Sequence, residues 1–202
     1  MKTYKIISIL SLIFSLTGCS PEDDIRNPEL KPLLFSEDFA VGAVDNTTLN
    51  TLGWANIAEV GSVKWTEQVF SGNAYAEFTS FRSPDLVNIS WLVSPKINMD
   101  ANEGEILVFR ASQSFVTSTA NSLEVLVSTN FDGTNVSAAT WTTLSAKLPT
   151  ISTPFFEFIK SGEIDLSSFT GNINIAFKVK GSGTNQALDG SYQIDDIRVF
   201  TK

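Results

Sequence analysis

The 202-residue sequence contains no histidine and only one cysteine. The absence of histidine excludes Ser-His-Asp triads, Cys-His dyads, histidine-ligated zinc and acid–base catalysis by imidazole. Because Cys19 is the lone cysteine, the chain cannot form an internal disulfide, and its stability must come from its core. An enzyme built from this sequence would have to work with carboxylates alone.

Positive charge is also scarce. The 14 lysines and arginines stand against 22 aspartates and glutamates, which gives a net charge of −8. Such an acidic chain would repel the phosphates of nucleic acid, so we exclude nucleic acid as a partner. The same acidic composition suits cation sites that are built from oxygen ligands.

No apolar run is long enough to cross a bilayer as a helix. The run Ile6–Leu16 follows two lysines and is shorter than the roughly 18 residues that a span requires. This pattern predicts a signal peptide over residues 1–18. It ends in LTGC, which resembles the signal box of bacterial lipoproteins and implies cleavage before Cys19 and lipidation of its sulfur. A plain secretory peptide is the alternative.

Residues 19–32 are predicted to form an acidic tether and linker. The stretch SPEDD after Cys19 resembles the export signal that sends lipoproteins of Bacteroidota-type bacteria to the outer cell surface. This resemblance implies an outer-membrane protein that is lipid-anchored and displayed at the cell surface. Retention at the periplasmic face is the alternative, with the acidic stretch acting only as a solvated tether.

Residues 33–202 are predicted to form one all-β domain. β-branched and aromatic residues recur with a period of two, as in the set Leu123, Val125 and Val127 and the set Ile173, Ile175, Phe177 and Val179. Turn signals such as Asp132-Gly133 separate these segments. About nine to eleven short strands with this spacing indicate a two-sheet antiparallel β-sandwich of jelly-roll type.

From about Leu33 to Phe200 the chain resembles the choice-of-anchor-J and cleaved-adhesin domains, which are related to MAM-like and galactose-binding-like jelly rolls. A similar version occurs in surface lipoproteins of Bacteroidota. The resemblance rests on the order of nine segments: LFSEDF, LGWANI, VKW, SGNAYAEF, WLVSPKINM, LEVLVSTNFDG, TWTTLSA, GEIDLSSFTGNINIAFKV and YQIDDIRVF. One departure is the approach to Gly53-Trp54, which is usually proline-rich in the family and here is Thr51-Leu52.

The resemblance implies a structural calcium ion between an acidic residue of the first strand and an aspartate of the last. The matching positions are Glu37 and Asp195. Asp196 and Asp38 are weaker candidates, because neighbouring side chains on a strand point to opposite faces. Calcium takes about six to eight oxygen ligands, and here it would link distant parts of the chain. The alternative is that these acids are solvated at the rim.

Aromatic residues are the candidate ligand contacts. Trp54 and the other three tryptophans could form a platform for stacking sugars, although the apolar strand pattern around each one favours packing in the core or at a sheet edge. Phe115 lies in the polar segment SQSFVTSTANS, where an exposed aromatic has less reason to pack. Folding back over the sheet is the alternative for Phe115.

The paired acids do not predict catalysis. Glu163 and Asp165 resemble the acid-x-acid strand of laminarinase-type glycoside hydrolases, but the further glutamate that those enzymes need is missing. A strand end that leads into a turn explains the stretch better. Asp195 and Asp196 are adjacent on a predicted strand, so their side chains should diverge and not share a proton.

These observations predict a non-catalytic cell-surface lipoprotein. We expect its domain to be a binding or adhesion module for glycans or for host and matrix polymers. The alternative is an envelope scaffold or accessory subunit that binds another protein of a surface uptake or assembly complex. The expected cofactor is the structural calcium ion, and the expected membrane contact is the lipid anchor at Cys19.

Overall fold

Alternating burial runs along the long strands of the computed structural model, which describes residues 31–202. In β13 (Asn172–Gly181) the buried core residues are Ile173, Ile175, Phe177 and Val179. In β9 (Ser122–Ser128) they are Leu123, Val125 and Val127. The predicted period of two is confirmed in both strands.

The described residues form fourteen β-strands and one short 3-10 helix, η1 (Gln186–Leu188). Nine strands are longer than two residues: β1 (Leu33–Glu37), β3 (Ala55–Val60), β4 (Thr66–Phe70), β5 (Asn73–Thr79), β6 (Asn88–Val93), β8 (Glu105–Ser114), β9, β13 and β14 (Ser191–Thr201). Five have two residues each: β2 (Thr47–Thr48), β7 (Ile97–Asn98), β10 (Thr142–Thr143), β11 (Ile159–Lys160) and β12 (Ile164–Asp165). Within residues 31–202, no helix has the length and apolar character needed to span a membrane.

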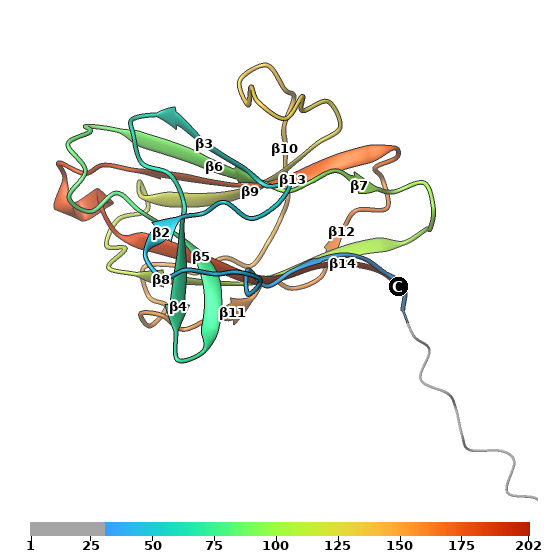
Figure 1. Cartoon of the computed structure of the whole chain (residues 1–202), viewed down its shortest axis with the longest axis horizontal. Helices are drawn as coiled ribbons and strands as arrows, with labels where there is room; N and C mark the ends of the chain where they lie inside the picture. Colours follow the sequence, from blue (N-terminus) through green and yellow to red (C-terminus); the bar gives the residue numbers. More distant parts are fainter. Residues whose placement is uncertain (1–30) are drawn as a thin grey trace, which may run out of the picture. The chain divides into compact units, whose positions relative to one another are not determined.

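The strands make two antiparallel sheets that pack face to face (Figure 1). The eight-stranded sheet has the order β11-β8-β14-β5-β4-β2, with β1 also paired to β14 and β12 to β8. The six-stranded sheet has the order β10-β9-β13-β6-β3, with β7 also paired to β13. The fold is therefore the β-sandwich of jelly-roll type that the sequence predicts.

Strand β14 organises the eight-stranded sheet. It pairs with β8 along most of its length. On its other side it pairs first with β5, through Ile194, and then with β1, from Ile197 onward. The register against β8 shifts between Asp195 and Arg198, so β14 carries a β-bulge where its neighbour changes.

The core lies between the sheets. Phe109 of β8 and Phe177 of β13 meet there edge to face, with ring centroids 5.1 Å apart. A second apolar cluster covers the outer face of the six-stranded sheet, where Trp91 packs against Trp141 from the segment after β9. Each sheet is thus buried on its inner face, and the smaller sheet is also partly covered on its outer face.

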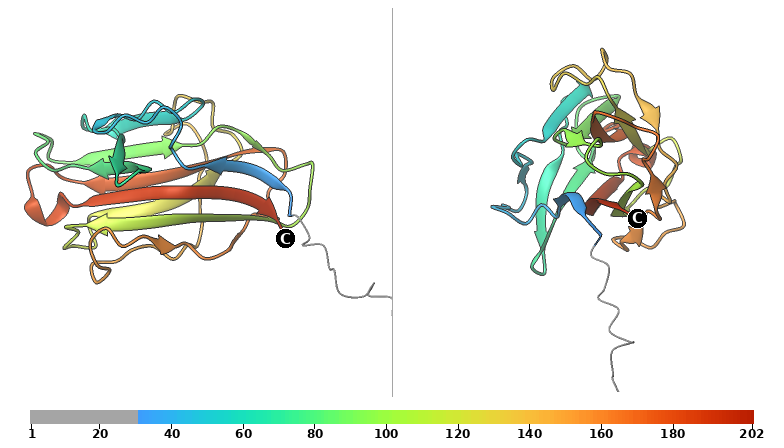
Figure 2. Two further views of the ribbon diagram at one scale, coloured as in Figure 1. Left: turned by 60° about the horizontal axis from the view of Figure 1, so that its bottom comes forward. Right: turned by 90° about the vertical axis from the view of Figure 1, so that its right-hand side faces the viewer.

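The two ends of the sandwich differ (Figure 2). The C-terminus and the start of β1 lie at one end. At the other end lie the β13–β14 connection, which contains η1, and the connections β5–β6 and β8–β9. Three connections from distant parts of the sequence therefore meet at the end farther from the C-terminus.

We expect Phe109→Ala to lower the free energy of unfolding by about 3–5 kcal/mol, because it removes a buried ring between the sheets and leaves a cavity. Denaturant or thermal unfolding would measure this loss. The matched control is Phe70→Ala, since Phe70 is 72% exposed and its removal should cost little. Equal losses for the two variants would contradict the described core.

Candidate binding groove

The predicted acids Asp195 and Asp196 lie at the β-bulge of β14 and bind the same guanidinium. Arg110 of β8 lies opposite Asp195 in the register. Its Nη2 is 2.9 Å from Asp195 Oδ2, and its Nε is 2.7 Å from Asp196 Oδ2. The expectation that these neighbouring side chains diverge is therefore wrong.

The bulge explains why both acids reach one partner. Asp196 has a left-handed backbone conformation, with φ of 50°. An extra residue of this kind interrupts the alternation of a strand, so two successive side chains can leave on the same face. Ile194 and Ile197, on either side of the bulge, both remain in the core.

Asp195 is held by donors from three segments. Only 1% of the residue is exposed. Its carboxylate accepts hydrogen bonds from Arg110 of β8, from Asn73 Nδ2 at 3.0 Å and from the Asp196 backbone N–H at 2.6 Å. A buried carboxylate requires such partners. Asp195 therefore joins β8, β14 and the start of β5.

Glu37 lies elsewhere. It is paired in register with the core residue Ile197, and opposite residues of an antiparallel pair share a face. Its carboxylate accepts hydrogen bonds from the Phe39 N–H at 2.7 Å and from Trp54 Nε1 at 3.1 Å. Asp195 binds Arg110 on the outer face of the same sheet, so the structure does not bring Glu37 and Asp195 together.

This arrangement does not fit a calcium ion shared by Glu37 and Asp195. Both carboxylates already have protein donors, and they lie on opposite faces of the sheet. In residues 31–202 there is no group of three or more acidic, histidine or cysteine side chains placed to hold a metal ion. The calcium site stays a prediction from the resemblance, without support in this geometry.

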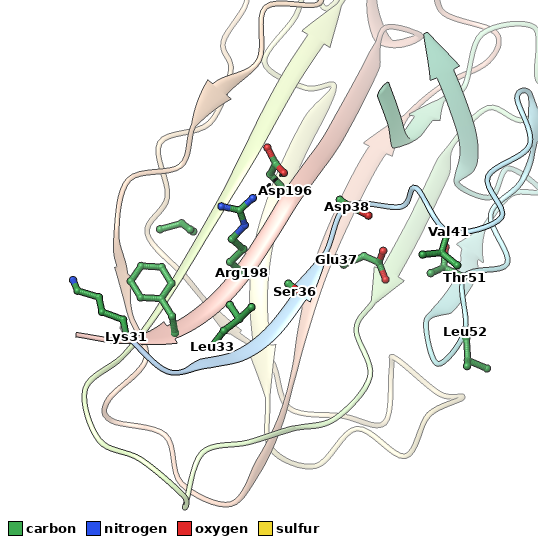
Figure 3. Close-up of a pocket in the computed structure, with 12 residues that line it drawn as sticks. Lys31, Leu33, Ser36, Glu37, Asp38, Val41, Thr51, Leu52, Asp196 and Arg198 are labelled. Carbon is green, nitrogen blue, oxygen red and sulfur yellow. Dashed lines mark hydrogen bonds and ion pairs between the residues drawn. The ribbon is translucent and has the colours of Figure 1, made fainter. Parts of the chain in front are cut away.

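Glu37 and Asp196 instead line a broad cavity of about 990 Å³ beside β1 and the second half of β14 (Figure 3). Apolar side chains contribute to its wall, among them Leu33, Val41 and Leu52. Val41 and Leu52 are almost fully exposed. The cavity is therefore an open surface hollow with mixed chemistry.

Phe115 marks a second, more organised hollow. Its side chain is exposed and its ring lies 4.7 Å from that of Phe155, centroid to centroid. The connection between β10 and β11 meets the eight-stranded sheet at the edge formed by β8, where the Phe156 N–H donates to the Gln113 carbonyl at 2.8 Å. Of the two alternatives for Phe115, exposure and folding back over the sheet, the structure has the exposed side chain.

A glycine permits the close approach that places Phe115. A Cβ atom on Gly190 would lie 2.6 Å from the backbone nitrogen of Val116 and 2.7 Å from the Phe115 carbonyl oxygen. Real Cβ atoms do not approach backbone so closely, so the β8–β9 and β13–β14 connections need glycine at this position.

Two hollows of about 560 Å³ each adjoin on this face, and Glu77 and Phe156 line both of them. We call them together the outer-face groove. Its aromatic lining consists of Phe70, Tyr75, Phe81, Phe115, Phe156 and Phe158. Polar side chains of β5 and β14, including Asn73, Glu77 and Ser191, lie between the rings.

A hydrogen-bonded row of side chains underlies the groove. Ser112 donates to Gln193 Oε1 at 2.6 Å, and Gln193 Nε2 donates to Glu77 Oε2 at 2.6 Å. Ser114 and Ser191 share a hydrogen bond of 2.6 Å. These contacts fix the polar side chains of three adjacent strands, so the base of the groove is preorganised.

The acid in this row, Glu77, has a raised pKa. Burial raises the pKa of Glu77, and the negative charge of Asp45 raises it further, against the lowering effect of hydrogen bonds from Gln193 and Ser191. Burial, together with the charges of Glu77 and Asp45, also raises the pKa of Tyr75. The groove therefore holds a carboxylate that lacks a positive partner.

The other residues singled out in the sequence have contacts that explain them by packing or by a turn. Trp54 packs between Phe35 and Phe39 against the core and lines none of these hollows. Asp165 accepts hydrogen bonds from the Ser167 N–H and hydroxyl, which lower its pKa, as expected for a strand end leading into a turn. Cys19, the proposed lipidation site, lies outside the described residues.

Sequence reasoning missed Phe156 and Glu77. Phe156 stands in STPFFEF, a polar and proline-containing connection, so the argument that singled out Phe115 could have found it. Glu77 gave no such signal, because an outward acid on an alternating strand is ordinary.

The fold and groove define a β-sandwich with a preorganised, aromatic-lined surface groove. The chain belongs to the family described as "Domain of unknown function (DUF5017)", whose model matches residues 96–201. No curated protein sequence matches the chain.

Two cleaved adhesin domains of known structure share the fold. The K1 cleaved adhesin domain of Lys-gingipain from Porphyromonas gingivalis W83 is 17% identical, with a TM-score of 0.51, covering 83% of this chain and 98% of that one. The K2 cleaved adhesin domain is 14% identical, with a TM-score of 0.53, covering 83% and 99%. The CBM22-1 xylan-binding domain of Paenibacillus barcinonensis Xyn10C is 16% identical, with a TM-score of 0.47, covering 85% and 96%. The predicted resemblance to cleaved-adhesin domains is confirmed as a likeness of fold.

We expect Arg110→Met to lower the free energy of unfolding by about 3 kcal/mol, because it leaves the buried Asp195 carboxylate without its cation. The control is Arg198→Met, since Arg198 is 56% exposed at its side chain and contacts Asp196 at 3.4 Å. Loss of this surface pair should cost under about 1 kcal/mol. Equal denaturation midpoints for the two variants would show that the Arg110 contacts carry no special weight.

Chelation tests the calcium prediction. With Glu37 and Asp195 on separate protein donors, thermal unfolding should have the same midpoint in excess calcium and in excess chelator. A midpoint that falls in chelator and recovers on adding calcium would reinstate the calcium site. Glu37→Gln would then have to abolish the difference.

Proposed function

We propose that this protein is a non-catalytic binding module that takes a glycan chain in the outer-face groove. The observation that carries this proposal is the set of exposed phenylalanines around a fixed polar base. Phe115 and Phe156 are 60% and 53% exposed, although apolar side chains of this size are usually buried. Exposed aromatic clusters of this kind mark binding surfaces.

The chemistry of the groove suits a sugar. A pyranose presents apolar C–H faces and a rim of hydroxyl groups, so it can stack on rings while it exchanges hydrogen bonds with polar side chains. The groove offers Phe156 and Phe158 as rings, and Asn73, Gln68 and Glu77 as polar partners. Two adjoining hollows would accommodate consecutive sugar units along one chain.

The setting of the module is part of the proposal. The K1 and K2 domains with the same fold are cleaved adhesin domains of a bacterial protein. We propose a surface-exposed adhesin-type role here, with lipid attached at Cys19 anchoring the protein at the outer membrane. The three connections that bear Phe81, Phe115 and Gly190 lie at the end of the sandwich opposite the C-terminus (Figure 2).

A protein partner is the second candidate. The cavity of Figure 3 supports it, because Leu33, Val41 and Leu52 expose apolar surface beside the charged side chains of Glu37 and Arg198. A mixed surface of this kind suits docking to another envelope protein in a scaffold or accessory role.

A glycan array probed with the protein tests the leading proposal. We expect binding to a restricted set of related glycans. Phe115→Ala and Phe156→Ala should each weaken it about tenfold, or about 1.4 kcal/mol, because each removes a stacking face. Backbone hydrogen bonding of Phe156 to Gln113 should hold the loop in the alanine variant.

The control is Leu52→Ala, which removes an exposed apolar side chain outside the groove. Its binding should equal that of the unmodified protein. An array without signal, or binding that survives both phenylalanine substitutions, would contradict glycan recognition in the groove. Binding to a membrane protein that only Leu52→Ala weakens would favour the second candidate.

A further inference from the structure

The charged side chains that line the outer-face groove are all of one sign. Glu77 lines both hollows and Asp189 lines one of them, whereas neither hollow is lined by a lysine or an arginine. Two arginines lie nearby. Arg82 stacks over Phe81 at the rim, exposed to solvent, with its guanidinium carbon 4.9 Å from the ring centre.

The second arginine, Arg110, does not neutralise the groove. Its guanidinium carbon lies 5.4 Å from the centre of the Phe158 ring. However, its nitrogens are bound to Asp195 and Asp196 at 2.9 and 2.7 Å. Asp196 also contacts Arg198 at 3.4 Å, so two arginines balance two carboxylates in this cluster, and Arg110 leaves no free positive charge at the groove.

Glu77 lies where the two hollows meet. Its described hydrogen bonds come from neutral groups, the amide of Gln193 and the hydroxyl of Ser191. Tyr75, Phe156 and Phe158 line the same hollow. A cation at this position is attracted by the charge of the partly buried carboxylate and also by the negative faces of the surrounding rings.

We infer that the groove selects glycans that carry free amino groups, with Glu77 as the counter-ion of the ammonium, and rejects glycans that carry carboxylate or sulfate groups. This inference rests on the proposed function and names the class of sugar. An ammonium group at Glu77 supplies the missing positive charge. An acidic sugar places like charge against Glu77 and Asp189 in a groove without a compensating base.

The test uses three tetrasaccharides with one backbone: β-1,4-linked glucosamine, glucose and glucuronic acid. Titration calorimetry at low salt and about pH 6.5 compares their affinities. We expect glucosamine to bind about tenfold or more tightly than glucose, and glucuronic acid to bind more weakly than glucose. Added salt should shrink these differences.

The informative variant is Glu77→Gln, which keeps the size of the side chain and an oxygen that can accept from Gln193. It should reduce the affinity for the glucosamine tetramer about tenfold and leave that for the glucose tetramer unchanged. The control Glu163→Gln removes an exposed acid outside the groove, so all three affinities should stay as they are. Thermal unfolding checks that both variants are folded.

The inference is overturned if the glucosamine tetramer does not bind, if glucuronic acid binds as tightly as glucosamine, or if Glu77→Gln leaves the affinity for glucosamine unchanged. It is also overturned if tetralysine binds more tightly than the glucosamine tetramer and Phe156→Ala has no effect, since the site would then recognise a basic peptide. The array decides the proposed function separately, because uncharged glycans that bind in a Phe156-dependent way would support it even without this preference.

Discussion

The buried charge of Asp195 is the constraint on which the eight-stranded sheet depends. A carboxylate with 1% exposure is tolerable only when it is fully paired. Asn73, Arg110 and the Asp196 N–H supply that pairing from three segments. The bulge that makes this possible lies where β14 exchanges β5 for β1 as its neighbour. One ionic cluster therefore stabilises the point at which β14 changes its neighbouring strand from β5 to β1.

That cluster also shapes the surface beside it. Arg110 is occupied by two acids, so it supports the ring of Phe158 without offering a free positive charge. Next to it, the row from Ser112 through Gln193 to Glu77 orders the polar base of the groove. The aromatic wall comes from a different part of the chain, the connection that contains Phe155 and Phe156. Fold stability and binding chemistry thus meet on one face of the larger sheet.

The sequence was sufficient to predict the sandwich, because apolar residues alternate without a break in the long strands, as at Ile173, Ile175 and Phe177, and this alternation marks the face that packs in the core. For Phe115 it left exposure and folding back over the sheet as alternatives, and the side chain is exposed. The divergence of Asp195 and Asp196 was predicted wrongly, since a period of two assumes a regular strand and a bulge has no local signature here. The groove was not predicted, because Glu77 and Phe156 come together only through long-range packing.

Several of the contacts that attach the wall of the groove to the sheet are made by main-chain groups. Phe156 N–H bonds to the Gln113 carbonyl, and Ser161 N–H bonds to that of Phe109. Such contacts are indifferent to the side chains that the connection carries. The rings and polar groups of this segment can therefore be exchanged during evolution while the two sheets keep the same packing. Proteins with this sandwich could in this way acquire different ligands at little expense in folding.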